Sequence, residues 1–305
     1  GGGGAGGEAR CAPWNDNWDF RSSEEKTNVV RHIVLVRHGQ YDEKGKGDAA
    51  KVLTELGREQ ARLTGKRLAG YLPAGVQWKA VYQSDMARAK ETAKIVMTEI
   101  NASMPAVALQ DPIALLDEGY PAEPVPAPST RLWAERKTWE HAPRIEAAFR
   151  MFFHRENAPK VKSGGQTGAG NASPPSGPAD PAAFKDEAKK PPASEHTYEL
   201  VVGHGNVIRF FVCRALQFSP EAWLRIAVYN CSITHIVIGS TGRVSLYTLG
   251  DVGHLDPRSQ VAYRRVTAAM CVSFHQGLAR LWPQRRDNSA RADKTRGEAP
   301  REEAG

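Results

Sequence analysis

The sequence predicts an α/β protein in which a mostly parallel central sheet has helices on both faces, a three-layer α/β/α sandwich. Strand-like and helix-like segments alternate along the chain, which is typical of parallel sheets with helical connections. The first strand-like segment, residues 31–36, is apolar on both of its faces and rich in β-branched residues. A strand of this kind is expected in a sheet that is covered on both sides.

The elements that follow the first strand support this prediction. Residues 53–71 are predicted as a helix, because apolar residues recur at roughly helical spacing and Thr54 is a suitable N-cap. A short apolar strand at 80–82 and a second helix at 88–100 come next. Residues 107–110 are predicted as a further strand.

The middle of the chain contains a loop and a helix. Residues 121–128 are rich in proline and are expected to form a loop, since proline fixes φ and lacks a backbone donor. Residues 139–154 are predicted as a helix. Its apolar face is formed by Ile145, Ala148, Phe149 and Phe152.

Composition changes abruptly at about residues 156–196, where Gly, Pro, Ser, Ala and Lys dominate. Such a segment cannot bury a core, so we expect a disordered insertion. The elements predicted after it are a strand at 198–202, a helix at 207–216, and a hairpin of 233–239 and 243–249 around a turn at 240–242. Because the strands on each side of the insertion look incomplete alone, we expect one domain, 29–286, between a flexible N-terminal arm, 1–28, and a disordered tail, 287–305.

Composition excludes several classes of protein. The net charge of +7 is modest and spread along the chain, so we expect no nucleic-acid partner and instead attraction for anionic substrates. The four cysteines lack zinc-site spacing, and we expect neither a metal nor a disulfide scaffold. No uninterrupted apolar run of about 18 residues is present, so any membrane anchor or targeting segment is expected to lie outside these 305 residues.

Polar residues that suit phosphate chemistry follow the predicted strands. Arg37 and His38 come directly after the first strand, and His204 comes after the strand at 198–202. Arg88 lies just past the strand at 80–82, and Glu118 follows a short apolar run. Since ligands bind beyond the carboxyl ends of the strands in open α/β sheets, we expect these five residues to share one rim.

Together these residues predict phosphoryl transfer without a metal or cofactor. Arginine pairs two phosphate oxygens at once, and a neutral imidazole can attack phosphorus to give a phosphohistidine. A second imidazole, if protonated, can donate to the same oxygens, and a carboxylic acid can protonate the leaving alkoxide. A lone Arg-His-Gly tripeptide occurs by chance, and each residue alone has a structural interpretation. The joint placement at strand ends favours the catalytic interpretation.

Four ordered motifs strengthen this interpretation. Residues 35–40, 53–61, 84–92 and 202–206 resemble the histidine phosphatase superfamily, also called the phosphoglycerate mutase-like family. The resemblance implies a phosphoglycerate mutase-like fold with His38 as the nucleophile. It further implies that Arg37, Arg88 and His204 bind the phosphate and that Glu118 donates the proton.

The resemblance extends from about residue 14 to 254, apart from the insertion, to a mitochondrial group of serine/threonine protein phosphatases within this family. The segments that carry it are 14–19, 144–150, 211–218, 221–225 and 248–251. It implies phosphorylated proteins as substrates, a mitochondrial location with membrane association of the full-length protein, and a homo-oligomer, a dimer or larger.

The N-terminal segment 14–19 contains a tryptophan motif. In relatives it engages a neighbouring subunit and activates the enzyme. The residues that the resemblance assigns to assembly are Trp14, Asn17, Trp18 and Asp19. Asn15-Asp16 replaces the Asp-Pro of the family, so docking is expected in an altered form; packing of both tryptophans on their own domain is the alternative.

Other functions stay open at this stage. A phosphoglycerate mutase is less favoured, because residues 39–42 depart from the Trp-Asn continuation common in mutases and the loop after Glu118 is a poor lid. A small-molecule phosphatase and a scaffold or adaptor in a mitochondrial assembly are further alternatives. A scaffold could lose a catalytic residue, whereas every expected position is filled.

Overall fold

A computed structural model of the chain describes residues 13–24, 26–156 and 194–261, all within one compact unit. The strands are β1 Val29–Arg37, β2 Trp78–Gln83, β3 Glu195–Gly203, β4 Ile233–Ile238 and β5 Val244–Asp251. The α-helices are α1 Glu55–Ala69, α2 Ala87–Asn101, α3 Arg131–Phe152 and α4 Gly205–Ala215. Short 3-10 helices are η1 Ala114–Leu116, η2 Pro220–Arg225 and η3 Pro257–Ser259.

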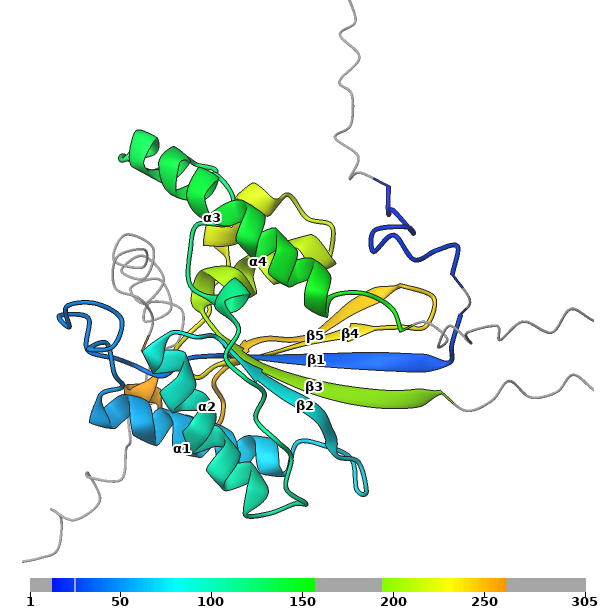
Figure 1. The fold of residues 1–305 in the computed structure, drawn as a ribbon, viewed down its shortest axis with the longest axis horizontal. Coiled ribbons are helices and arrows are strands. Elements are labelled where there is room, and N and C mark those ends of the chain that lie inside the picture. Colours follow the sequence, from blue (N-terminus) through cyan, green and yellow to red (C-terminus); the bar gives the residue numbers. More distant parts are fainter. Residues whose placement is uncertain (1–12, 25, 157–193, 262–305) are drawn as a thin grey trace, which may run out of the picture. The chain divides into compact units, whose positions relative to one another are not determined.

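The five strands form one sheet in the order β2-β3-β1-β4-β5. β1 and β2 both pair with β3 in parallel, while β4 is antiparallel to its neighbours β1 and β5. Four strands therefore point the same way and β4 points the opposite way. Helices α3 and α4 cover one face and α1 and α2 the other (Figure 1). The predicted three-layer α/β fold is confirmed, with a mixed rather than purely parallel sheet.

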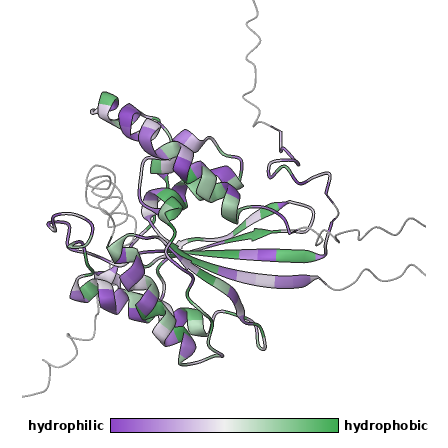
Figure 2. Cartoon of the chain, in the orientation of Figure 1, coloured by the Kyte–Doolittle hydropathy of each residue, from purple (hydrophilic) through white to green (hydrophobic). Residues whose placement is uncertain are grey.

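Alternation along β1 creates two separate cores. Ile33 and Leu35 point to the layer of α3 and α4, where they join a cluster that includes Phe149 and Phe211. Val34 and Val36 point to the opposite face, toward α1 and α2. All four β1 side chains are almost fully buried, which explains the continuous apolar run in the sequence. Figure 2 shows that the helices on both faces of the sheet carry hydrophilic as well as hydrophobic residues.

Most predicted elements are present with small shifts at their ends. The predicted cap of α1 is confirmed, because the Thr54 hydroxyl accepts a hydrogen bond from the Gly57 backbone N–H at 3.1 Å. β3 begins at Glu195, so Glu195 and His196 belong to the sheet, although we predicted them as the end of the insertion. Residues 157–193 and the predicted tail at 287–305 lie outside the described residues, as do the first twelve residues of the arm.

Two predicted elements were wrong in extent. Residues 107–110 form no strand; Leu109 makes an isolated parallel bridge with Val81, and a second isolated bridge joins Ile113 to Ser84. Helix α3 begins at Arg131, eight residues before the predicted start. Its first turns leave Leu132 82% exposed, so no apolar face marks them in the sequence. Ion pairs between residues four apart, such as Arg131 with Glu135, support this part of the helix.

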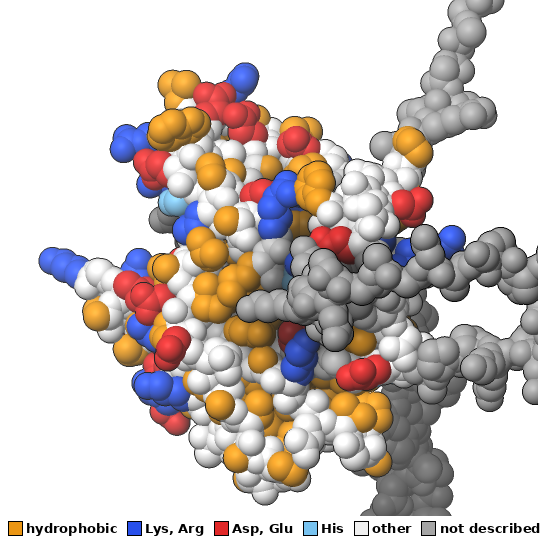
Figure 3. Space-filling view, turned by 45° about the vertical axis from the view of Figure 1, so that its right-hand side comes forward, with side chains coloured by type: hydrophobic (Ala, Val, Ile, Leu, Met, Phe, Trp, Pro, Cys, Tyr) orange, Lys and Arg blue, Asp and Glu red, His pale blue; other side chains and the backbone are white. Residues whose placement is uncertain are grey.

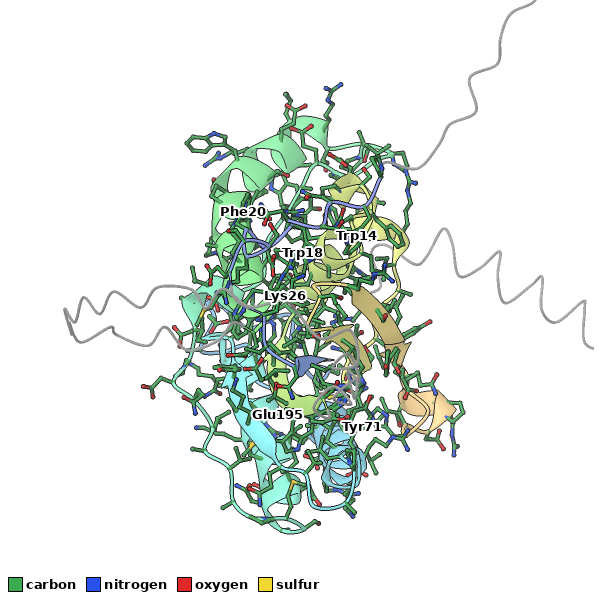
Figure 4. The ribbon with its side chains drawn as sticks, turned by 90° about the vertical axis from the view of Figure 1, so that its right-hand side faces the viewer. Trp14, Trp18, Phe20, Lys26, Tyr71 and Glu195 are labelled. Atoms are coloured by element: carbon green, nitrogen blue, oxygen red, sulfur yellow. The ribbon has the colours of Figure 1, made fainter. Side chains whose placement is uncertain are left out.

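The described part of the N-terminal arm is packed against the domain. The Trp18 ring lies 6.1 Å from the Phe149 ring, and its indole N–H donates to the Gly242 carbonyl at 2.8 Å. Asp19 forms an ion pair with Arg155 at 2.9 Å, and both side chains are buried. Figure 4 shows the arm with Trp14, Trp18 and Phe20 running along the layer of α3 and α4.

The surface carries charges of both signs. On the face shown in Figure 3, basic and acidic side chains are intermixed with apolar ones. Within the described ranges, no helix has the length and apolar character needed to cross a membrane.

Candidate active site

His38 lies at the carboxyl end of β1, where its side chain is 2% exposed. The Gly39 carbonyl lies 2.8 Å from Nδ1 and can only accept, so Nδ1 carries the proton. The lone pair of the ring is therefore on Nε2. Burial, followed by the charges of Arg37 and Arg88, holds the pKa of His38 well below its usual range. His38 is thus a neutral imidazole at pH 7, with a nucleophilic nitrogen in a fixed orientation.

Two buried arginines lie beside His38. The Nε–H of Arg88, at the start of α2, donates to His38 Nε2 at 3.3 Å. Arg37 precedes His38 on β1 and donates from Nη1 to the Val228 carbonyl at 2.7 Å. Its buried Nε has no hydrogen-bond partner among the described residues. Burial lowers the pKa of Arg37 to about 10, so the group stays charged at pH 7. Each arginine can therefore offer N–H donors to an anion beside Nε2.

His204 lies at the N-cap of α4, and its ring centroid is 5.1 Å from that of His38. Its Nε2 donates to the Ser84 hydroxyl at 2.7 Å, because that hydroxyl donates in turn to Asp117 at 2.7 Å. Nδ1 is buried and has no partner in the described ranges. Burial first, and then the neighbouring charges, holds the pKa of His204 well below its usual range. Binding of an anion near Nδ1 would favour the protonated ring, with the Asp117 carboxylate balancing its charge through Ser84.

Glu118 follows η1 in a segment without regular structure. Its carboxyl accepts a hydrogen bond from the Gly119 backbone N–H at 3.2 Å. Surrounding protein atoms raise the pKa of Glu118 by removing water, against the opposing charges of Arg88 and Arg37. A raised pKa suits a carboxyl group that must give and take a proton near neutral pH.

The structure thus brings the five predicted site residues together at one rim of the sheet. The four residues of the tryptophan motif lie elsewhere, in the arm beside α3. Trp18 and Asp19 contact the same chain's own domain, and Trp14 is 38% exposed. In the described parts of the chain, no group of three or more His, Cys, Asp or Glu residues is arranged to hold a metal ion.

Sequence reasoning missed several supporting residues. Asp48, in the loop after β1, pairs with Arg88 at 3.3 Å and accepts from the Ala87 backbone N–H at 2.7 Å. It thereby caps α2, whose own N-cap residue, Met86, makes no side-chain cap. Ser84 and Asp117 form a chain of hydrogen bonds to His204, in which the Ser84 hydroxyl lies between the imidazole and the carboxylate. Asp48 has no signal in the sequence, whereas the other two adjoin predicted site segments and could have been found there.

The chain is similar to proteins of one known family. The family model of the histidine phosphatase superfamily (branch 1) matches residues 33–111 and 182–249. The mitochondrial serine/threonine-protein phosphatase Pgam5 of Drosophila ananassae is 37% identical over 268 residues, which cover 80% of this chain and 79% of the relative.

A protein of the same name from Caenorhabditis briggsae is 37% identical over 266 residues, covering 80% of this chain and 79% of its own. Among solved structures, phosphoglycerate mutase from Plasmodium falciparum is 31% identical, with a TM-score of 0.43. That match covers 75% of this chain and 96% of the mutase.

Proposed function

Since the chain belongs to the histidine phosphatase superfamily and is a phosphatase, we propose that it hydrolyses phosphoserine and phosphothreonine in proteins through a phosphohistidine at His38. The observation that carries the role of His38 is its fixed tautomer: Nδ1 donates to the Gly39 carbonyl, so the lone pair that attacks is on Nε2, beside the Nε–H of Arg88. The relatives named as serine/threonine-protein phosphatases support the class of substrate.

The first step transfers the phosphoryl group to the enzyme. The lone pair of His38 Nε2 forms a bond to phosphorus as the bond from phosphorus to the seryl or threonyl oxygen breaks. Glu118, whose pKa is raised by burial, gives its proton to that departing oxygen. Arg37, Arg88 and His204 bind the phosphoryl oxygens, and the charge of the transition state is spread over these donors.

The second step returns the enzyme to its resting state. The Glu118 carboxylate accepts a proton from a water molecule as the water oxygen attacks phosphorus. The bond between phosphorus and His38 Nε2 breaks, its electron pair returns to the imidazole, and inorganic phosphate leaves. Both protonation states of Glu118 are used in turn, so no further acid or base is needed.

A direct assay separates this proposal from its alternatives. Phosphate release is measured from phosphoserine and phosphothreonine peptides and from small phosphate esters. Isomerisation of 3-phosphoglycerate is measured in parallel. The proposal predicts that the peptides are hydrolysed with the highest kcat/KM. Preferred turnover of small esters would favour a small-molecule phosphatase, and strong isomerisation would favour a mutase. Lack of turnover of all substrates would favour a scaffold.

The proposed function also includes the location and the assembly of the protein. The relatives are named as mitochondrial, which supports a mitochondrial location for this chain, with membrane association of the full-length protein. We further propose a homo-oligomer in which the tryptophan motif of one copy binds a neighbour where it binds its own domain here. The contacts that would be exchanged are those of Trp18 with Gly242 and of Asp19 with Arg155.

Deletion of residues 1–19 tests the assembly. Mass in solution and kcat/KM should both fall in the truncated protein, because Trp18 and Asp19 supply the exchanged contacts. Unchanged mass and activity would contradict a role of the motif in assembly.

A further inference from the structure

Arg144, on α3, holds the segment that carries Glu118. Its Nη1 donates to the carbonyl oxygens of Ala114, Leu115 and Asp117 at 3.1, 2.9 and 2.8 Å. Its Nη2 donates to the carbonyl oxygen of Glu118 itself at 3.2 Å. One guanidinium group therefore contacts four backbone carbonyls between residues 114 and 118.

This segment depends on side chains for its backbone hydrogen bonds. Beyond η1 it has no regular structure, so neither a helix nor a strand fixes its carbonyl groups. The Tyr120 backbone N–H donates to His141 Nδ1 at 3.2 Å, and Asn206 donates to the Gly119 carbonyl at 3.0 Å. Residues of α3 and α4 thus hold the chain on both sides of the Glu118 carboxyl, and Arg144 makes most of these contacts.

Gly119 allows the close approach of the segment to α3. A Cβ atom at residue 119 would lie 2.8 Å from the Cβ of His141 and 3.0 Å from Nη2 of Arg144. Distances this short would force the segment away from the helix. The position of the Glu118 backbone is therefore set by its contact with α3, and the side chain of Arg144 is central to that contact.

We propose that Arg144 is a positioning residue for the general acid: it holds the Glu118 carboxyl in place to protonate the leaving oxygen without touching the substrate. This inference rests on the proposed role of Glu118. Burial is the main cause of the raised pKa of Glu118, and the charges of Arg144 and Glu118 also attract, since Glu118 acts to raise the pKa of Arg144. The hydrogen bonds of Arg144 are to the backbone of this segment, and a small displacement of the carboxyl is enough to impair proton transfer.

The test uses two substrates that differ in their need for an acid. A phosphoserine peptide has an alkoxide leaving group that must be protonated, whereas p-nitrophenyl phosphate has a leaving group that departs without help. Arg144→Lys keeps the charge but loses the planar fork of donors. It should lower kcat/KM on the peptide by about tenfold or more and leave p-nitrophenyl phosphate within about threefold, since general acids contribute about 10²–10⁴.

Two controls keep the result interpretable. Arg150→Lys changes an arginine on the same helix that is paired with Glu146 at the surface, and it should leave both substrates unaffected. The readout is the ratio of kcat/KM on the two substrates, which does not depend on the fraction of enzyme that is folded. If Arg144→Lys is poorly folded, Arg144→Gln is measured by the same ratio.

A double variant decides whether Arg144 acts through Glu118. In a Glu118→Gln background, Arg144→Lys should lower peptide turnover by less than about twofold further, because residues that act as a unit are not additive. Equal losses on both substrates, or an additive loss in the double variant, would overturn the positioning role. If Glu118→Gln itself spares the peptide, the acid role in the proposed function fails instead.

Discussion

Folding stability should fall in mild acid because of a chain of histidines on the sheet. His32 Nδ1 lies 2.9 Å from His235 Nε2, and His32 Nε2 lies 2.8 Å from His196 Nδ1. The Tyr71 hydroxyl lies 3.0 Å from His235 Nδ1. If the Tyr71 hydroxyl donates to His235 Nδ1, His235 Nε2 can donate to His32 Nδ1 and His32 Nε2 to His196 Nδ1, so that neutral His32 and His235 each use one proton. A further proton on His32 or His235, which are both buried, would place a charge there without a carboxylate in these contacts.

The pKa values give the size and sign of the effect. Burial, with repulsion from His235 and His196, lowers the pKa of His32 to about 4. Burial lowers the pKa of His235 to about 4 as well. In the unfolded chain both groups titrate near 6.5, so below that pH the unfolded state binds more protons and stability falls. The loss approaches its limit near pH 4. At pH 5 each group contributes about 2 kcal/mol of destabilisation.

Urea unfolding at pH 7.5 and pH 5.0 measures this loss. Wild-type protein is compared with His32→Gln/His235→Gln, in which the other buried histidines titrate as before. The free energy of unfolding of the wild type should fall by about 2–4 kcal/mol more than that of the double variant between the two pH values. Equal losses in both proteins would refute the assignment of acid sensitivity to this cluster.

Three further substitutions probe the site and the arm. Glu118→Gln should lower turnover of a phosphoserine peptide by about 10²–10⁴ and spare p-nitrophenyl phosphate, measured as kcat/KM; equal losses would argue against Glu118 as the acid. Asp48→Asn should lower the inhibition constant of inorganic phosphate by up to about fivefold, because it frees Arg88 from a partly exposed ion pair; weaker inhibition would show that Asp48 helps to bind the phosphate. Asp19→Asn should lower the free energy of unfolding by about 3–5 kcal/mol, because Arg155 would be left buried and unpaired; a loss below about 1 kcal/mol in urea unfolding would contradict this.

Much of the fold follows from local patterns in the sequence. The apolar run of β1 predicts a strand buried on both sides, and Ile33 and Val34 do point into separate cores. Thr54 predicts the start of α1. The first turns of α3 escaped prediction, because Leu132 and Trp133 remain exposed there and no apolar periodicity marks a buried face. The isolated bridges of Leu109 with Val81 and of Ile113 with Ser84 show that a segment can contact the edge of the sheet without forming a continuous strand.

Most of the candidate site could be predicted because its residues follow strands, while Glu118 follows the short apolar run that forms η1. His38 and His204 could be placed together because β1 and β3 are parallel neighbours. Asp48 and Arg144 reach the site from a loop and from α3, and no sequence spacing relates them to Arg88 or Glu118. The contacts of the arm could not be predicted from local sequence either, since Asp19 and Arg155 are 136 positions apart in the chain.

Direct capture of the phosphorylated enzyme tests the central claim. The wild type is mixed with a phosphopeptide and quenched in alkali, which preserves a nitrogen–phosphorus bond, and its peptides are mapped by mass spectrometry. We predict a phosphoryl group on His38 that appears within one turnover. The His38→Ala variant should carry no phosphoryl group and release no phosphate. A phosphoryl group on another residue, or normal turnover by His38→Ala, would contradict the mechanism.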